Sequence, residues 1–251
     1  MSVIRVENLN KSIKGKVILE DLSFTVERGD CLALIGPNGA GKTTLMNCLL
    51  GDMKATSGII EVEGKAPGHP QLKASVSYLP QENAIVQKLT VQELINFFRS
   101  IYPNPLTGEE IDDLLRFSLE QKKQLASKLS GGQKRLLSFV LTLIGRPSLL
   151  FLDEPTAAMD TSTRQRFWEI VGDLKEQGVT IVYSSQKRWR VDVSMAAVGS
   201  SKNRRLGRPI KVSTKDRRRF CPPDSLLANC FFCSGVKRNR SSISLTVKGW
   251  G

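Results

Sequence analysis

One segment constrains the fold of this chain more than any other. Residues 36–44 read Gly-Pro-Asn-Gly-Ala-Gly-Lys-Thr-Thr and contain the pattern G-x-x-x-x-G-K-[ST], between an apolar run and a helix-like segment. In such a loop the backbone N–H groups converge on phosphate oxygens, the lysine supplies a cation and the hydroxyl is offered to Mg²⁺. The sequence therefore predicts a phosphate-binding turn made of Gly36, Pro37, Asn38, Gly39, Ala40, Gly41, Lys42, Thr43 and Thr44.

Two hydrophobic patterns predict two kinds of sheet. Apolar and polar residues alternate in 3–9 and 22–26, which is typical of half-buried antiparallel strands. The runs 31–35, 149–152 and 179–183 are largely apolar, as in strands that are covered on both faces. We therefore expect an α/β fold in which a parallel core sheet carries an antiparallel β edge.

The stretch between a strand at 76–79 and the strand at 149–152 is predicted to be helical. Its apolar run, 136–144, is about half the length that crosses a bilayer, which favours a buried helix. Another helix is expected over 162–176, with Asp160 as N-cap and Gly178 at its end. Three segments of the helical stretch fit the capping box, in which side chain and backbone satisfy each other: Thr90 to Glu93, Thr107 to Glu110 and Ser130 to Gln133.

Two adjacent carboxylates, Asp153 and Glu154, end the apolar run 149–152. Neighbouring side chains on a strand point to opposite sides, so the two are expected to do different work. Phosphoryl transfer needs such a division: Asp153 is predicted to hold Mg²⁺ and Glu154 to orient or deprotonate an attacking water. Taken alone, the pair could equally be a solvated strand end.

The segment Leu-Ser-Gly-Gly-Gln, 129–133, has the features of a second anion site. A hydroxyl and two small residues stand at the start of a helix, where backbone N–H groups are exposed. An ordinary helix cap would have the same features. The predicted contacts to an anion come from Ser130, Gly131 and Gly132.

With these motifs in order over residues 1–185, the sequence closely resembles the ATP-binding subunit of an ABC transporter, of the multidrug or antibiotic-exporter type. The resemblance identifies 36–44 as Walker A, 129–133 as the signature and 149–154 as Walker B. It also identifies Gln81 as the Q-loop residue, expected in catalysis and in the Mg²⁺ shell, and Asp160 as the D-loop residue at the nucleotide.

The resemblance implies a P-loop ATPase of ABC type over 1–186, with a helical subdomain over roughly 83–145. It implies ATP and Mg²⁺ as ligands and a head-to-tail homodimer or heterodimer. The implied function is ATP hydrolysis that powers a separately encoded membrane permease, at the inner face of the cytoplasmic membrane. The alternative is a non-transport ABC ATPase that acts on ribosomes or nucleic acid.

Charge divides the chain into two parts. Residues 1–186 hold 21 Lys/Arg and 21 Asp/Glu, whereas 187–251 hold 16 and 3 of the chain's 37 and 24. The neutral body gives no electrostatic reason to bind nucleic acid. The cysteines of the basic part, Cys221, Cys230 and Cys233, lack a fourth metal ligand, since the only histidine is the distant His69.

The resemblance stops at Gln186, where the family has a switch histidine. A glutamine amide can donate a hydrogen bond but cannot take up a proton, so we expect impaired hydrolysis. A small deletion that changes the reading frame would produce Gln-Lys-Arg-Trp here, and residues 187–251 would then be a non-native or disordered tail that leaves a sheet edge uncovered. The rival hypothesis is a selected basic arm for nucleic acid or anionic lipid.

Overall fold

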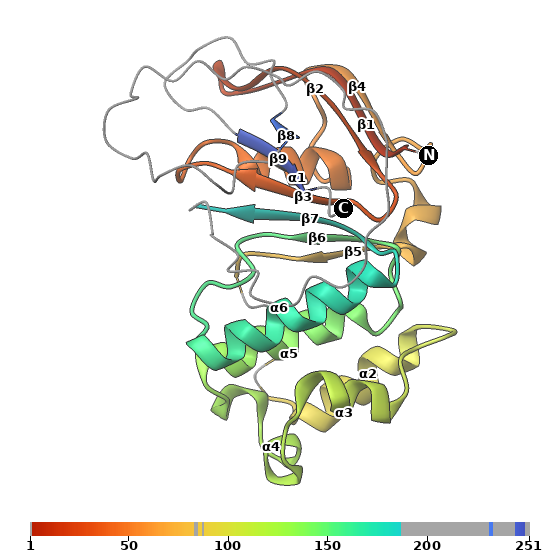
Figure 1. The fold of residues 1–251 in the computed structure, drawn as a ribbon, viewed down its shortest axis with the longest axis vertical. Coiled ribbons are helices and arrows are strands. Elements are labelled where there is room, and N and C mark those ends of the chain that lie inside the picture. Colours follow the sequence, from red (N-terminus) through yellow and green to blue (C-terminus); the bar gives the residue numbers. More distant parts are fainter. Residues whose placement is uncertain (1, 83–84, 87, 187–230, 233–243, 249–251) are drawn as a thin grey trace, which may run out of the picture.

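The computed structural model describes residues 2–82, 85–86, 88–186, 231–232 and 244–248. Their strands form two sheets, and the helices lie between and beside these sheets (Figure 1). In the described part of the chain, no helix has both the length and the hydropathy needed to cross a bilayer.

The core sheet has the strand order β5-β6-β7-β3-β9-β8. Its first four strands are parallel, which confirms the parallel core predicted from the apolar runs. Because parallel strands end at one edge, the residues that follow them meet there. These strands are β3 (Cys31–Ile35), β5 (Val76–Leu79), β6 (Leu149–Leu152) and β7 (Thr180–Ser185).

The antiparallel sheet has the order β2-β1-β4, as the alternating patterns predict for the first two strands. It consists of β1 (Ser2–Ile13), β2 (Lys16–Glu27) and β4 (Ser57–Val62). Helix α1 (Lys42–Leu50) lies between this sheet and the core sheet (Figure 1). One hydrophobic core joins the three layers, with Leu32 of β3 and Met46 of α1 fully buried in it.

The other face of the core sheet is covered by α5 (Gly131–Leu143) and α6 (Thr161–Glu176) (Figure 1). A second hydrophobic core fills this interface, and the ring centroids of Phe139 and Phe167 lie 4.5 Å apart in it. The buried helix expected over 136–144 is therefore the main part of α5. Asp160 caps α6, as predicted.

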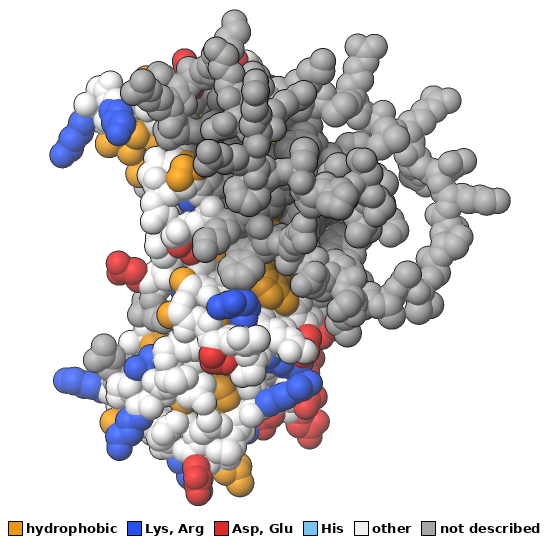
Figure 2. Space-filling view, turned by 60° about the vertical axis from the view of Figure 1, so that its left-hand side comes forward, with side chains coloured by type: hydrophobic (Ala, Val, Ile, Leu, Met, Phe, Trp, Pro, Cys, Tyr) orange, Lys and Arg blue, Asp and Glu red, His pale blue; other side chains and the backbone are white. Residues whose placement is uncertain are grey.

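The helices α2 (Val91–Ile101), α3 (Gly108–Leu115) and α4 (Leu119–Lys123) lie beyond α5 and α6 (Figure 1). Basic and acidic side chains are interspersed over the surface at this end of the molecule (Figure 2). Short 3-10 helices occur at η1 (Pro70–Ala74) and η2 (Ala126–Lys128). All three predicted capping boxes are present, and Ser118 with Gln121 adds a fourth at α4. Local hydrogen bonds thus fix where each of these helices begins.

The sheet edge beside β3 is occupied, so the expectation of an uncovered edge is wrong there. Strand β9 (Ser244–Lys248) pairs antiparallel with β3, and β8 (Phe231–Phe232) pairs with β9. The segment 244–248 alternates polar and apolar residues, the sequence signal of a strand, within a tail whose charged residues are mostly basic. The remainder of 187–251, including its cysteines and most of the segment assigned to a changed frame, lies outside the described residues.

Candidate nucleotide site

The predicted phosphate-binding loop connects β3 to α1, the context that the pattern requires. Gly39 and Gly41 have φ angles of +79° and +92°, a left-handed conformation that favours glycine. Gly41 is the N-cap of α1, and no side chain caps this helix start. The first turn of α1 therefore presents its backbone N–H groups to the space in front of the loop.

Lys42 is 4% exposed and its side chain folds back over the loop. Its Nζ atom donates to the carbonyl oxygens of Gly36 at 2.9 Å and Pro37 at 3.0 Å. The same Nζ atom lies 4.0 Å from Oε1 of Glu154. The cation is thus held at the loop, where the outer phosphates of a nucleotide would lie.

Asp153 is completely buried and joins the loop to β7. Its Oδ2 atom accepts a hydrogen bond of 2.7 Å from the Thr43 hydroxyl, and Oδ1 accepts one of 2.5 Å from the Ser184 hydroxyl. Hydroxyl and carboxylate oxygens are the ligands that Mg²⁺ prefers. No group of three or more His, Cys, Asp or Glu side chains in the described residues is placed for a metal. The pair therefore fits an ion that takes its other ligands from phosphate and water.

The side chain of Glu154 has different partners from that of Asp153, but both residues follow the end of β6 and Glu154 has a φ angle of +45°, so strand alternation does not explain the difference. Its Oε2 atom accepts hydrogen bonds from the amide groups of Gln186 at 2.9 Å and Gln81 at 3.4 Å. Its backbone N–H donates to the Ser184 hydroxyl at 2.8 Å. The carboxylate thus lies between two glutamine amides and Lys42, beside the predicted position of the outer phosphate.

Residues of the predicted signature lie at the start of α5. The Ser130 hydroxyl accepts from the backbone N–H of Gln133 at 3.2 Å, and the Gln133 side chain accepts from the N–H of Ser130 at 3.0 Å. A Cβ atom on Gly132 would lie 2.9 Å from Oδ2 of Asp160. Hydrogen bonds from the backbone N–H of Thr163 and from the hydroxyls of Ser162 and Thr163 lower the pKa of the Asp160 carboxyl group.

The structure therefore groups the predicted site residues into two clusters. The first cluster contains residues 36–44 with Gln81, Asp153, Glu154 and Gln186. The second contains Ser130, Gly131, Gly132 and Asp160. Within the described residues, no hydrogen bond joins one cluster directly to the other.

Three residues of this region were not predicted from the sequence. Ser184 bonds both carboxylate residues, and Arg135 is 1% exposed beneath them. Burial lowers the pKa of Arg135 to about 10 and raises that of the Tyr78 hydroxyl to about 12. The only sequence signal for Arg135 is a cation next to the apolar run 136–144, and Ser184 is an ordinary residue at a strand end.

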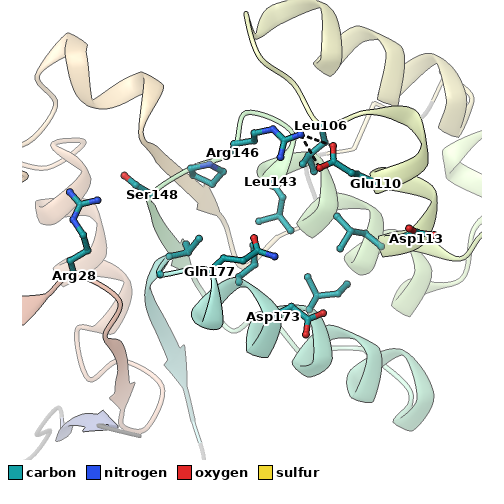
Figure 3. A pocket seen from close by; sticks show the side chains of 15 residues that line it. Arg28, Leu106, Glu110, Asp113, Leu143, Arg146, Ser148, Asp173 and Gln177 are labelled. Carbon is teal, nitrogen blue, oxygen red and sulfur yellow. Dashed lines mark hydrogen bonds and ion pairs between the residues drawn. The ribbon is translucent and has the colours of Figure 1, made fainter. Parts of the chain in front are cut away.

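A cavity of about 460 Å³ lies away from these clusters, where the parallel strands of the core sheet begin (Figure 3). Arg28, Ser148 and Val179 in its wall directly precede or lie just before the parallel strands β3, β6 and β7. An ion pair of 2.6 Å between Arg146 and Glu110 also lines it. This hollow is therefore distinct from the predicted nucleotide site.

Comparisons with known proteins agree with this geometry. Residues 19–157 match the family described as "ABC transporter". The lipopolysaccharide export system ATP-binding protein LptB of Haemophilus influenzae is 31% identical over 86% of this chain and 95% of its own length. The ABC transporter ATP-binding protein YtrB of Bacillus subtilis is 33% identical over 74% of this chain.

The chain spans less than two thirds of the length of some relatives that it matches. It covers 64% of YtrB and 27% of ABC transporter G family member 23 of Dictyostelium discoideum. Among solved structures, the ADP conformation of MJ1267, an ATP-binding cassette of an ABC transporter, is 27% identical with a TM-score of 0.62. That match covers 75% of this chain and 82% of the other.

Proposed function

This chain belongs to the ABC transporter family, and we propose that it binds and hydrolyses ATP to power a separately encoded membrane export permease. The observation that carries the proposal is the single cluster of Lys42, Thr43, Asp153 and Glu154 at the uncapped start of α1. Such a cluster combines a phosphate cation, a Mg²⁺ ligand pair and a carboxylate for water.

Each residue of the cluster has a defined task in this proposal. The N–H groups of the loop and Lys42 bind the outer phosphates, which fixes the nucleotide. Thr43 and Asp153 hold Mg²⁺, together with Gln81, and the ion when bound neutralises phosphate charge. Glu154 orients a water for attack and accepts its proton, because its carboxylate lies 4.0 Å from the Lys42 cation that binds the outer phosphate.

Gln186 makes hydrolysis slow in this chain. Its amide donates to Glu154 and helps to hold that carboxylate, but it does not exchange a proton with water. Loss of one positioned catalytic group lowers rates by roughly 10² to 10⁴. The Gln186→His variant tests this step: a rise in hydrolysis without a change in ATP affinity supports it, and unchanged hydrolysis contradicts it.

The partners in this proposal are a second ATPase chain and a permease. Ser130, Gly131, Gly132 and Asp160 contact the nucleotide held by the other chain of a head-to-tail dimer. The permease docks beside Gln81, where the following loop exposes the apolar side chain of Val86, which is 55% accessible. Export is favoured because relatives are named as export proteins, among them the Nod factor export ATP-binding protein I of Ralstonia nicotianae.

The decisive experiment compares ATP binding with ATP turnover. The Glu154→Gln variant keeps every phosphate contact, so we expect parental ATP affinity and roughly 10² to 10⁴ less hydrolysis. Affinity is measured by calorimetric titration and turnover by release of phosphate. Parental turnover in Glu154→Gln would remove the carboxylate from the mechanism, and absence of ATP binding by the parent chain would overturn the proposed function.

A further inference from the structure

Arg135 is a buried cation whose guanidinium group donates to several backbone carbonyl oxygens. Its side chain donates to the carbonyl oxygens of Pro80 at 2.6 Å, Asp153 at 2.8 Å and Pro155 at 3.0 Å. A longer bond of 3.3 Å reaches the carbonyl of Glu154. One guanidinium therefore connects two segments that are more than 70 residues apart in the sequence.

These carbonyls belong to the points where two neighbouring strands end. Leu79 ends β5 opposite Leu152, which ends β6, and the N–H of Asp153 still donates to the carbonyl of Leu79. The pairing of β5 with β6 ends at Leu79 and Leu152, so the carbonyl groups that follow are outside this strand pairing. A buried carbonyl without a partner is unfavourable, so the fork of donors on Arg135 replaces the missing sheet bonds.

The two segments held by Arg135 carry Gln81 and Glu154, whose side chains meet where the attacking water is predicted to lie. Gln81 directly follows Pro80, and both Gln81 and Gln186 bond the carboxylate of Glu154. Glu154 has a φ angle of +45°, a left-handed conformation that is uncommon for a glutamate. Such a backbone persists only when surrounding contacts determine it.

Arg135 also lies in the first turns of α5, five residues after the cap residue Ser130. Its backbone is part of the helix that carries the signature, while its side chain reaches the first cluster. This is a physical connection between the two clusters, which share no direct hydrogen bond among the described residues.

We propose that Arg135 is a positioning residue that holds the backbone of Gln81 and Glu154 in place and ties both to the start of α5. The proposal rests on the proposed function for its catalytic consequence. Its structural part does not, because the contacts join groups of this chain alone. These bonds reach the segments that carry Gln81 and Glu154, so we expect Arg135 to act mainly on hydrolysis and little on ATP affinity.

The test uses Arg135→Gln and Arg135→Lys, with Arg166→Gln as the matched control. Arg166 also donates from a helix to two backbone carbonyls, those of Asp113 and Leu114, but these lie at the end of α3. Amide hydrogen exchange is measured on the full chain without nucleotide. ATP affinity and single-turnover hydrolysis are measured with Mg²⁺.

For Arg135→Gln we expect exchange about tenfold faster in 79–82 and 153–157, ATP affinity within about threefold of the parent and hydrolysis roughly 10- to 100-fold slower. Arg135→Lys keeps the charge but not the fork, so we expect a smaller change of the same kind. Arg166→Gln should accelerate exchange in 113–116 only and leave hydrolysis unchanged.

Two results would overturn the proposal. The first is a uniform rise in exchange with equal losses of affinity and hydrolysis, which is the behaviour of a residue that only stabilises the fold. The second is parental exchange and hydrolysis in both Arg135 variants. If Arg135→Gln does not fold, Arg135→Lys decides by the same criteria. If the parent fails to bind ATP, the proposed function fails while the exchange pattern still tests the positioning role.

Discussion

Two helices of this protein begin at glycine-rich loops, and their first turns are built in opposite ways. Helix α1 has Gly41 as N-cap in a left-handed conformation and no side-chain cap. Helix α5 has Ser130 as N-cap, with both hydrogen bonds of a capping box to Gln133. The start of α1 is thus formed and open to an anion, whereas Ser130 of α5 already has a partner within its own helix.

If both loops bind nucleotide as we propose, this difference predicts that they do so in different circumstances. The loop before α1 has Lys42, Thr43 and Asp153 around it, so the groups that we propose for the outer phosphates and Mg²⁺ at this loop all come from one chain. The Ser130 oxygen accepts a hydrogen bond from the N–H of Gln133, which leaves the hydroxyl proton available to donate to a phosphate held by another chain. We therefore expect the first loop to determine affinity and the second to contribute only when two chains meet.

The largest expected effect comes from the cation of the first loop. Lys42→Ala removes the charged donor that faces the outer phosphates, so ATP affinity should fall by about 10²-fold. Lys134→Ala is the matched control, because Lys134 lies in the first turns of α5. Its affinity should stay within about twofold of the parent in calorimetric titration. Equal affinity in Lys42→Ala and the parent would refute the assignment of the loop.

The next largest effect is expected at Asp153, the predicted Mg²⁺ ligand beside the first loop. In Asp153→Ala the Mg²⁺ ligand pair is lost, so ATP affinity should no longer differ between Mg²⁺ and a chelator. Because this change also leaves the Ser184 and Thr43 hydroxyls without a carboxylate, Asp153→Asn is measured beside it. Glu154→Gln should keep the Mg²⁺ dependence. An unchanged dependence in both Asp153 variants would exclude the metal role.

A smaller effect separates the two glycines of the second loop. Gly132→Ala places a Cβ atom 2.9 Å from Oδ2 of Asp160, which is held by its own hydrogen bonds, whereas on Gly131 the nearest atom is 3.8 Å away. Gly132→Ala should therefore lower the free energy of unfolding by about 1 kcal/mol. Gly131→Ala should be neutral or stabilising, since alanine favours helices. Urea unfolding decides, and equal stability of the two variants would contradict the close packing.

The smallest effect is expected from the cap itself. Ser130→Ala removes the cap of α5, which should cost about 1 kcal/mol of unfolding free energy. Ser118→Ala removes the equivalent cap of the short helix α4 and serves as control. ATP affinity of the separate chain should be unchanged in both. A tenfold loss of affinity in Ser130→Ala would show that the two loops act within one chain, and the comparison would fail.

Features set by neighbouring residues were predictable from the sequence. The capping boxes at Thr90, Thr107 and Ser130 depend on residues three apart, and the buried strands depend on short apolar runs. The strand β9 was missed because its alternation covers only 244–248. Arg135 and Ser184 were missed because a polar residue gives no local sign that it will be buried against distant backbone.

The sequence by itself determined the phosphate-binding turn, since the spacing of glycines, Lys42 and Thr43 between a strand and a helix requires no other part of the chain. Only the tertiary structure decided which residues surround Glu154. The strand order β5-β6-β7-β3 does not follow the chain, so it brings Gln81, Glu154, Gln186 and the loop before α1 to one edge of the sheet. Such an arrangement depends on sheet pairing between distant segments, which no local pattern encodes.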